Sequence, residues 1–377
     1  MESKKINILC FFPGPTYCPK MIDFTGRFEM LSDKYEGEIY SWSCQEENQE
    51  IKMGAFTYRD CLNKTESYTK WKMLWHIVKH ASAYQKEKKV DLIICYDPLF
   101  TGLIGAFLKK KFKCKLIIEL NNSNLAEAIT AEAGTGLKTR LKIHVANLLR
   151  RFTLRRSDGI KLLTKNQLVD LEEKYHTKVV HCFHDFVPTN FFKDAVKQTK
   201  PHILFVGFPF YRKAVDILVK AFEKIVQQYP EFELHLIGHL LEDDAKKYLG
   251  TWHKNIKFIK PMSYEDLQPH FLNCYCFVLP SREEGMGRVL LEAMASGKSI
   301  IGCNVGGIPA LVENGVNGLL FEKEDINGLA DCLNRLLENP HINQKMGEAS
   351  EHAINESFSS EKYVQHLDAM IKEVLLV

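Results

Sequence analysis

The sequence predicts an α/β protein made of two tandem Rossmann-like domains, each a parallel sheet with helices on both faces. Its 377 residues exceed what one hydrophobic core normally serves, since single cores stop growing at about 250–300 residues. Short apolar runs alternate with helix-like stretches, as expected for strands that are buried on both faces. A polar, proline-containing stretch at 187–200 lacks either pattern and is typical of a linker.

The first half of the chain contains four apolar or β-branched runs separated by stretches with helical spacing. This order is typical of a sheet whose parallel strands are joined by crossover helices. The predicted strands are 6–12, 91–96, 115–120 and 159–164, and the predicted crossover helices are 71–89 and 99–111.

The second half repeats the alternation, with a turn and usually a helix after each apolar run. The last segment keeps apolar residues at helical spacing to the end of the chain, with Ser359 or Ser360 as its N-cap. We therefore predict an N-terminal domain at 1–195, a C-terminal domain at 196–357 and a final helix at 358–377. The predicted strands of the second domain are 202–207, 232–238, 256–260, 274–280 and 298–303.

The composition is that of a globular protein, with 45% apolar and 26% charged residues. The start, MESKKINILCFFPGP, reads as a first strand rather than a secretory signal, and no run of about 18 apolar residues occurs. We therefore predict a cytoplasmic location. The eleven cysteines are scattered without a CxxC pair or a metal-ligand spacing, and we interpret them as core residues rather than disulfide or zinc ligands.

The net charge of +3 conceals an asymmetry between the two halves. Residues 1–195 carry 31 Lys and Arg against 23 Asp and Glu, whereas the remainder carries 19 against 24. The first half is therefore the part that we expect to meet an anionic partner.

A basic amphipathic helix is predicted at 137–156, where apolar residues recur at helical spacing among seven Lys and Arg and no acidic residue. Two interpretations stay open. The helix packs on its domain with a solvated cationic face, or it is attracted to an anionic membrane surface as a peripheral contact. A nucleic-acid partner is not expected, because no recognition motif accompanies the basic residues.

The stretch 279–321 carries the chemistry. A strand ends at Pro280, a turn containing Gly285 and Gly287 follows, and a helix of strong helix formers begins at about Arg288. This order places unpaired backbone N–H groups and the positive end of a helix at the carboxyl edge of a parallel sheet, where open α/β folds bind ligands. Such an edge suits a diphosphate.

Glu284 and Glu292 lie on either side of this helix start. Carboxylates accept hydrogen bonds from adjacent hydroxyls, so a sugar and a ribose are natural partners for them. The alternative is that Arg288 and Glu292, at positions i and i+4, form an exposed ion pair of about 0.3–0.5 kcal/mol.

Glu284 and Glu292, with seven residues between them in EGMGRVLLEAMASG, resemble the EX7E signature of the retaining glycosyltransferases of family 4, which have the GT-B fold. The GGIP and NGVNGLLF segments that follow are similar to that family as well. Residues 203–222 resemble the opening of its C-terminal domain, and 256–267 resemble its base-binding turn. The resemblance covers nearly the whole chain and is specific from 200 to 325.

By this resemblance, Glu292 holds the ribose hydroxyls and Glu284 the donor sugar, while Lys213 neutralises the diphosphate leaving group without a metal ion or other cofactor. It also implies a deep cleft between the domains, domain closure on substrate, and a final helix that crosses back to the N-terminal domain. The donor-binding residues that it implies are Gly207, Phe208, Arg212, Lys213, Ile259, Pro261, Glu284, Gly285, Met286, Gly287, Arg288 and Glu292.

The chain departs from the family pattern at several positions. Phe208 stands after Gly207 where the family often has an arginine, so that Arg212 is the candidate for the missing charge, and Ala214 replaces a glycine. Asn121 aligns with a histidine that faces the donor sugar; as a catalytic candidate it hydrogen-bonds a hydroxyl but cannot relay a proton.

Gly14, after the first strand, matches a family loop near donor phosphate or acceptor. A simple tight turn explains it equally well.

The predicted function is a retaining hexosyltransferase-type glycosyltransferase. It moves a sugar from a nucleotide-diphosphate sugar to a glycan, lipid-linked or other hydroxyl acceptor, in cell-surface polysaccharide or glycoconjugate synthesis. The alternatives are a nucleotide-sugar epimerase of GT-B architecture and a non-catalytic nucleotide-sugar-binding partner subunit. An oxidoreductase is disfavoured, because no GxGxxG follows the first strand.

Overall fold

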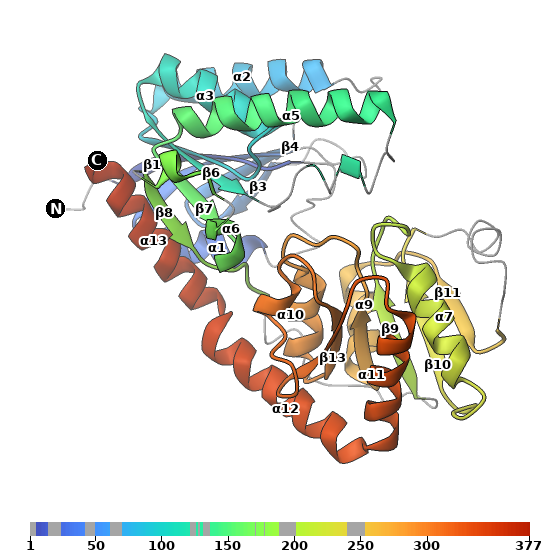
Figure 1. The fold of residues 1–377 in the computed structure, drawn as a ribbon. Coiled ribbons are helices and arrows are strands. Elements are labelled where there is room, and N and C mark those ends of the chain that lie inside the picture. The colour runs from blue at the N-terminus through green and yellow to red at the C-terminus, as the bar shows by residue number, and fades with distance from the viewer. Residues whose placement is uncertain are drawn as a thin grey trace. The chain divides into compact units, whose positions relative to one another are not determined.

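The chain forms two compact α/β units in a computed structural model (Figure 1). The first unit comprises Met1–Asn121, Leu141–His184 and Ser360–Val377, and the second comprises Asn122–Arg140 and Asp185–Ser359. The predicted cleft between the two domains stays a prediction. The structure describes residues 5–13, 24–41, 50–60, 70–120, 126, 129–130, 136–169, 171–176, 178–187, 201–239 and 253–377.

The first unit contains an eight-stranded sheet with the order β3-β4-β2-β1-β5-β6-β7-β8. All neighbours pair in parallel except β3, which runs antiparallel to β4. The four apolar runs form β1, β5, β6 and β7, as predicted. The strands are β1 (Ile6–Phe11), β2 (Tyr35–Ser41), β3 (Glu50–Met53), β4 (Phe56–Asp60), β5 (Leu92–Cys95), β6 (Lys115–Leu120), β7 (Gly159–Leu162) and β8 (Val179–Cys182).

Helices cover both faces of this sheet (Figure 1). The last helix of the chain packs on it, in contact with the first helix and with β6 and β8. The hydroxyl of Tyr35, at the start of the second strand, also donates to Asp368 of this helix at 2.7 Å. The helices are α1 (Phe24–Leu31), α2 (Lys70–Glu87), α3 (Phe100–Phe112), α5 (Leu137–Arg156), α6 (Lys165–Val169) and α13 (Ser360–Leu376).

The second unit contains a six-stranded, fully parallel sheet with the order β11-β10-β9-β12-β13-β14. All five predicted strands are present, and β14 is an addition. The strands are β9 (His202–Val206), β10 (Glu233–Ile237), β11 (Ile256–Ile259), β12 (Cys276–Leu279), β13 (Ile300–Cys303) and β14 (Gly318–Phe321); the helices are α7 (Val215–Ile225), α9 (Tyr264–Asn273), α10 (Arg288–Ala295), α11 (Ile326–Glu338) and α12 (Pro340–Ser357).

The order of this second sheet creates a switch point between β9 and β12. From β9 the chain proceeds outward to β10 and β11, then returns beside β9 and proceeds the other way through β12, β13 and β14. The loops after β9 and β12 therefore leave the same sheet edge toward opposite faces. Ligands of open α/β sheets bind at this place, outside the carboxyl ends of the strands.

Two sequence predictions can be checked on the described residues. Their cysteines are mostly buried, as predicted for core residues. None of the described helices combines the length and the apolar character that a bilayer span requires.

Candidate functional site

The candidate site lies at the switch point, in the loops that follow β9 and β12. Close backbone contacts fix the start of the loop after β9: the N–H of Gly207 donates to the carbonyl of Ile237 at 3.0 Å. A Cβ at Gly238 would overlap the carbonyl oxygen of Gly207. The chain after β10 therefore needs glycine at 238 to pass the loop after β9.

A buried ion pair joins the two loops, between Lys213 Nζ and Glu284 Oε2. Ser281 Oγ donates to the same carboxylate oxygen at 3.3 Å. Burial alone raises the pKa of Glu284, but the charge and the hydrogen bond of Lys213 outweigh it, so the pKa lies below its ordinary value. Glu284 is thus ionised at neutral pH, and the structure brings together the two residues that the sequence assigned to donor sugar and leaving group.

Arg282 is a site residue that the sequence analysis missed. Its guanidinium donates to both carboxylate oxygens of Asp216 at 2.8 and 2.7 Å, to Glu324 at 2.6 Å and to the carbonyl of Tyr211 at 2.7 Å. The guanidinium carbon also lies 4.2 Å from the centre of the Tyr211 ring. This bidentate geometry ties the loop that carries Lys213 to the loop after β12. The motif SREEGMG contains the arginine, but its partners lie far away in sequence.

The loop after β12 ends at the amino terminus of α10. Gly287 caps this helix with φ 74°, in the left-handed region that favours glycine. The first-turn N–H groups of a helix have no intrahelical partner, and they carry the positive end of the helix dipole. The N–H groups around Met286, Gly287 and Arg288 lie at this helix start, where helices bind anions, and their role in binding a donor stays a prediction.

The GGIP segment clamps this loop from the side of β13. The N–H of Gly307 donates to the carbonyl of Glu284 at 3.1 Å. A Cβ at Gly306, which has φ +54°, would overlap that same carbonyl oxygen, and a Cβ at Gly307 would overlap the carbonyl oxygen of Gly285. The two glycines are thus required by close backbone approach.

Glu292 is buried on α10, with 9% of its surface exposed. Burial raises the pKa of its carboxyl to about 7, with only Arg288 opposing the shift. Among the described residues no hydrogen bond or ion pair of this carboxylate is found, so the alternative of an exposed pair between Arg288 and Glu292 is wrong. An unpartnered buried carboxylate is a ready acceptor for ligand hydroxyls.

The other predicted residues of the loop after β9 have contacts of their own. Phe208 is 52% exposed, with its ring edge-on to His239 at 5.7 Å. Arg212 lies 3.7 Å from Glu283. Ala214 adopts φ 50°, in the left-handed region, so the glycine of the family pattern has a conformational reason at this position.

Ile259 and Pro261 lie at the end of β11, two strands away from β9 in the sheet. Ile259 is half-buried and Pro261 is exposed. Asn121 and Gly14 lie outside the described residues, and their assignments stay predictions.

Comparison with known proteins points to a class of enzyme and to a fold. Residues 186–353 match the family model described as Glycosyl transferases group 1. This match supports a glycosyltransferase. Over 292 residues, 76% of each chain, the sequence is 27% identical to an uncharacterized glycosyltransferase from Methanocaldococcus jannaschii.

Solved structures establish the fold. Sucrose-phosphate synthase from Thermosynechococcus elongatus superposes with a TM-score of 0.82 at 16% identity, over 99% of this chain and 100% of that one. The Anabaena protein HepE, solved in complex with UDP-glucose, superposes with a TM-score of 0.71 at 15% identity, over 98% and 100% of the two chains. The fold is therefore the two-domain GT-B fold that the sequence predicted.

The elevated pKa of Glu292 predicts a specific pH dependence of stability. The folded chain retains a proton that the unfolded chain releases between the ordinary carboxyl value of 4.5 and about 7, so stability is full below 4.5 and falls as the pH rises to about 7. Glu292→Gln should therefore stabilise the ligand-free protein at pH 8 by about 3 kcal/mol, at about 1.4 kcal/mol per pKa unit, and leave it unchanged near pH 4. Denaturant unfolding at both pH values measures this.

The matched control for this experiment is Glu351→Gln, which alters an exposed glutamate of α12. It should change stability little at either pH. Equal stability of wild type and Glu292→Gln at pH 8 would show that the carboxylate is not penalised by burial.

Gly307→Ala should destabilise the second unit. Gly307 has φ −87°, which alanine adopts without strain, so the effect comes only from the Cβ that overlaps the carbonyl of Gly285 and lies 2.8 Å from Cα of Met286. Overpacking of this kind costs about 1–3 kcal/mol, measurable by denaturant unfolding. Gly136→Ala is the control, since a Cβ there meets nothing within 4 Å; equal behaviour of the two variants would contradict the clamp.

Proposed function

We propose that the protein is a retaining glycosyltransferase of family 4 that takes a sugar from a nucleotide-diphosphate sugar and passes it to a hydroxyl of a glycan or lipid-linked acceptor. Its place would be in the synthesis of a cell-surface polysaccharide or glycoconjugate. The observation that carries the proposal is the arrangement at the switch point: a buried lysine–glutamate pair, a helix amino terminus, and a second buried carboxylate without a partner. The complex of HepE with UDP-glucose supports a nucleotide-sugar donor for this fold.

Glu292 is the residue that we assign to the ribose. Its two carboxylate oxygens accept hydrogen bonds from two adjacent hydroxyls, and its burial means that these bonds form in a medium where they are strong. Two hydroxyl donors would also offset the cost of ionising Glu292, so binding of the nucleotide should lower its pKa.

Lys213 and the amino terminus of α10 are the groups that we assign to the leaving diphosphate. As the bond between the anomeric carbon and the diphosphate oxygen breaks, negative charge develops on that oxygen, and preorganised cations and N–H groups stabilise it. Glu284 holds Lys213 in place beforehand. We propose that this stabilisation acts without a catalytic metal ion.

The acceptor proton needs a destination when the acceptor oxygen bonds the anomeric carbon. Glu284 is ionised and already paired with Lys213, and an asparagine such as Asn121 has no titratable atom. We therefore assign the proton to the departing diphosphate oxygen, which becomes the strongest nearby base.

The donor site predicts nucleotide-dependent thermal stabilisation. One nucleotide family among UDP-, GDP- and ADP-sugars and free nucleotides should raise the melting temperature by mass action. Glu292→Gln should weaken that binding on the order of tenfold or more, because hydrogen bonds to a charged group contribute about 1.5–3 kcal/mol. Glu351→Gln should bind as the wild type does.

Turnover assays separate the alternatives. Release of free nucleotide that requires an acceptor supports the transferase. A changed sugar on the nucleotide without any acceptor would indicate an epimerase, and tight binding without turnover would indicate a binding subunit. No stabilisation by any nucleotide, in folded protein, would contradict the donor site.

The basic helix α5 supports a second element of the proposal, a membrane-associated acceptor. The buried residues of α5, which include Ala146 and Leu154, face the unit to which the helix belongs. The apolar stripe instead faces solvent, with Leu141 at 65%, Leu148 at 53% and Phe152 at 38% exposed. Packing on its own unit does not account for this stripe, whereas the plane of a membrane interface does.

A groove beside α5 extends this apolar surface. It has a volume of about 870 Å³ and is lined mainly by apolar side chains of α2, α3 and α5, with cations at its rim. Trp75 and Phe107 are 58% and 60% exposed beside it. Exposed aromatic rings flanked by Lys110 and Lys111 suit an anionic bilayer, toward which each cation contributes about 1 kcal/mol. We propose that this face binds an anionic membrane that carries the acceptor.

Vesicle binding tests the membrane face. The full chain should cosediment with vesicles rich in phosphatidylglycerol and not with pure phosphatidylcholine, and salt should weaken binding. Trp75→Gln with Phe107→Gln should reduce binding on the order of tenfold or more, since each loses buried apolar area. Val316→Gln, at a 48% exposed apolar residue of the second unit, should not. Equal binding to both vesicle types, or equal binding by all variants, would contradict the membrane face.

A further inference from the structure

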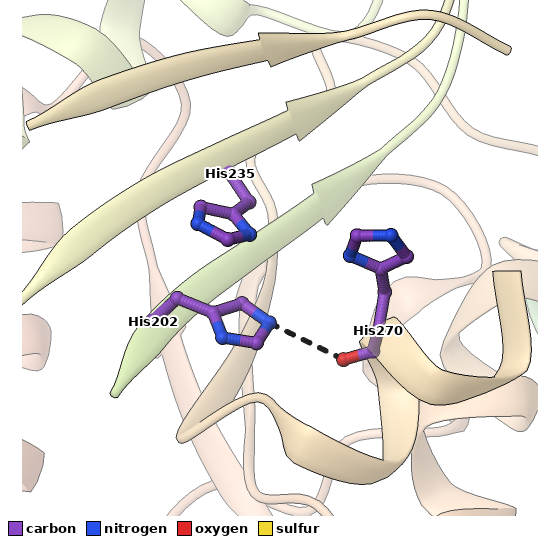
Figure 2. A group of neighbouring side chains, drawn as sticks. All are labelled: His202, His235 and His270. Atoms are coloured by element: carbon purple, nitrogen blue, oxygen red, sulfur yellow. Dashed lines mark hydrogen bonds between the residues drawn. The ribbon is translucent and has the colours of Figure 1, made fainter. Parts of the chain in front are cut away.

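Three histidines from three elements meet in the second unit: His202 on β9, His235 on β10 and His270 on α9 (Figure 2). In the parallel pairing of the strands His202 lies opposite Glu233. His235, two residues beyond Glu233, therefore projects from the same face of the sheet as His202. His202 begins β9, so the cluster lies toward the edge opposite to Gly207 and the donor site.

The three imidazoles are close enough to share one ion. One ring nitrogen from each lies within 4.8 Å of the others. The rings of His202 and His235 stack with centres 4.1 Å apart, and the His270 ring stands across both. Zinc binds imidazole nitrogens at about 2.0–2.1 Å, which places tetrahedral ligands about 3.4 Å apart. The stacked rings of His202 and His235 are 17° from parallel, so one of them must turn before both lone pairs point at a shared ion.

One of the rings is already oriented as a metal-binding histidine usually is. Nε2 of His235 lies 3.1 Å from a carboxylate oxygen of Glu233, and Nε2 of His202 lies 3.3 Å from the carbonyl oxygen of His270 (Figure 2). When Nε2 of His235 carries the proton it donates to Glu233, and Nδ1 of that ring then presents a lone pair. Carboxylates orient metal-ligating histidines in the same way. In His202 the nitrogen on the side of His270 is Nε2 (Figure 2), so this ring would bind the ion through Nε2 in place of its contact with the carbonyl.

The cluster also contains buried nitrogens with no hydrogen bond. Within the described part of the chain, Nδ1 of His235 and Nδ1 of His270 are buried and have no hydrogen-bond partner. A neutral imidazole with an unused lone pair is the form that binds a transition metal, and burying it unsatisfied is unfavourable.

We propose that His202, His235 and His270 bind one Zn²⁺ ion, at a site separate from the donor site. Three nitrogen ligands disfavour Mg²⁺ and Ca²⁺, which prefer oxygen, and favour Zn²⁺ and its imidazole-binding neighbours. His202 is fully buried, whereas His235 and His270 are half-buried, so the ion enters from the side of α9 and a water completes its coordination. The ion ties β9, β10 and α9 together and stabilises the folded unit.

No local pattern in the sequence indicates this site, and no metal was predicted. The histidines stand 33 and 35 residues apart and show none of the short ligand spacings of zinc motifs. Only strand pairing and the placement of α9 bring them together.

Zinc titration of the chelator-treated full chain tests the proposal. Competition with a chromophoric chelator should show one Zn²⁺ per chain, and zinc should raise the melting temperature. His270→Gln and His235→Gln should each weaken binding on the order of 10–100-fold. His341→Gln, which alters an exposed histidine of α12, should bind zinc as the wild type does. No stoichiometric binding, or equal loss in the control, would overturn the site.

Cobalt substitution tests the wild type directly, so that the result does not depend on variants that fold. Co²⁺ at this site should give the intense visible absorption of four- or five-coordinate cobalt, and added Zn²⁺ should remove it. The weak spectrum of octahedral Co²⁺, or a spectrum that zinc does not displace, would contradict the three-histidine site.

Discussion

The buried pair of Lys213 and Glu284 is the interaction on which the candidate site depends, because it joins two loops whose contacting residues lie 71 positions apart. Removing a lysine and a carboxylate from water costs several kcal/mol per ion, and only good geometry with additional hydrogen bonds offsets that cost. Ser281 supplies one such bond. A buried pair therefore constrains both loops strongly, since separating the charges without water leaves each one uncompensated.

Arg282 and the glycines at 306 and 307 determine where the backbone of the two loops lies. The bidentate contact of Arg282 with Asp216 fixes the start of α7, and the glycines at 306 and 307 fix the backbone before α10. Both sets act on backbone position rather than on the ligand. A site that is positioned in this way before substrate arrives loses little energy to rearrangement during the reaction.

Whether a strand can be predicted from the sequence depends on how that strand is buried. Strands in the middle of each sheet are apolar on both faces and were found as runs, such as LIIC at 92–95. Strands β2 to β4 mix charged and aromatic residues, as in YEGEIYS. These strands tolerate charged residues because such residues form ion pairs across strands, as Arg59 and Glu38 do. Local pattern alone cannot distinguish such a segment from a loop.

The site shows the same limit. Glu284 and Glu292 were found because their spacing is local, whereas the partners of Arg282 and the histidine cluster depend on which strands become neighbours. Burial also could not be read from spacing, and the alternative of an exposed pair at Glu292 failed for that reason. The two glutamates, eight positions apart, consequently have opposite pKa shifts. Glu284 is paired with a cation and stays ionised, whereas burial of Glu292 outweighs the charge of Arg288 and raises its pKa to about 7. Carboxyl groups whose pKa values are shifted in opposite directions take different roles. Glu284 is held by a cation of the protein itself, whereas Glu292 keeps its hydrogen-bonding capacity for a ligand.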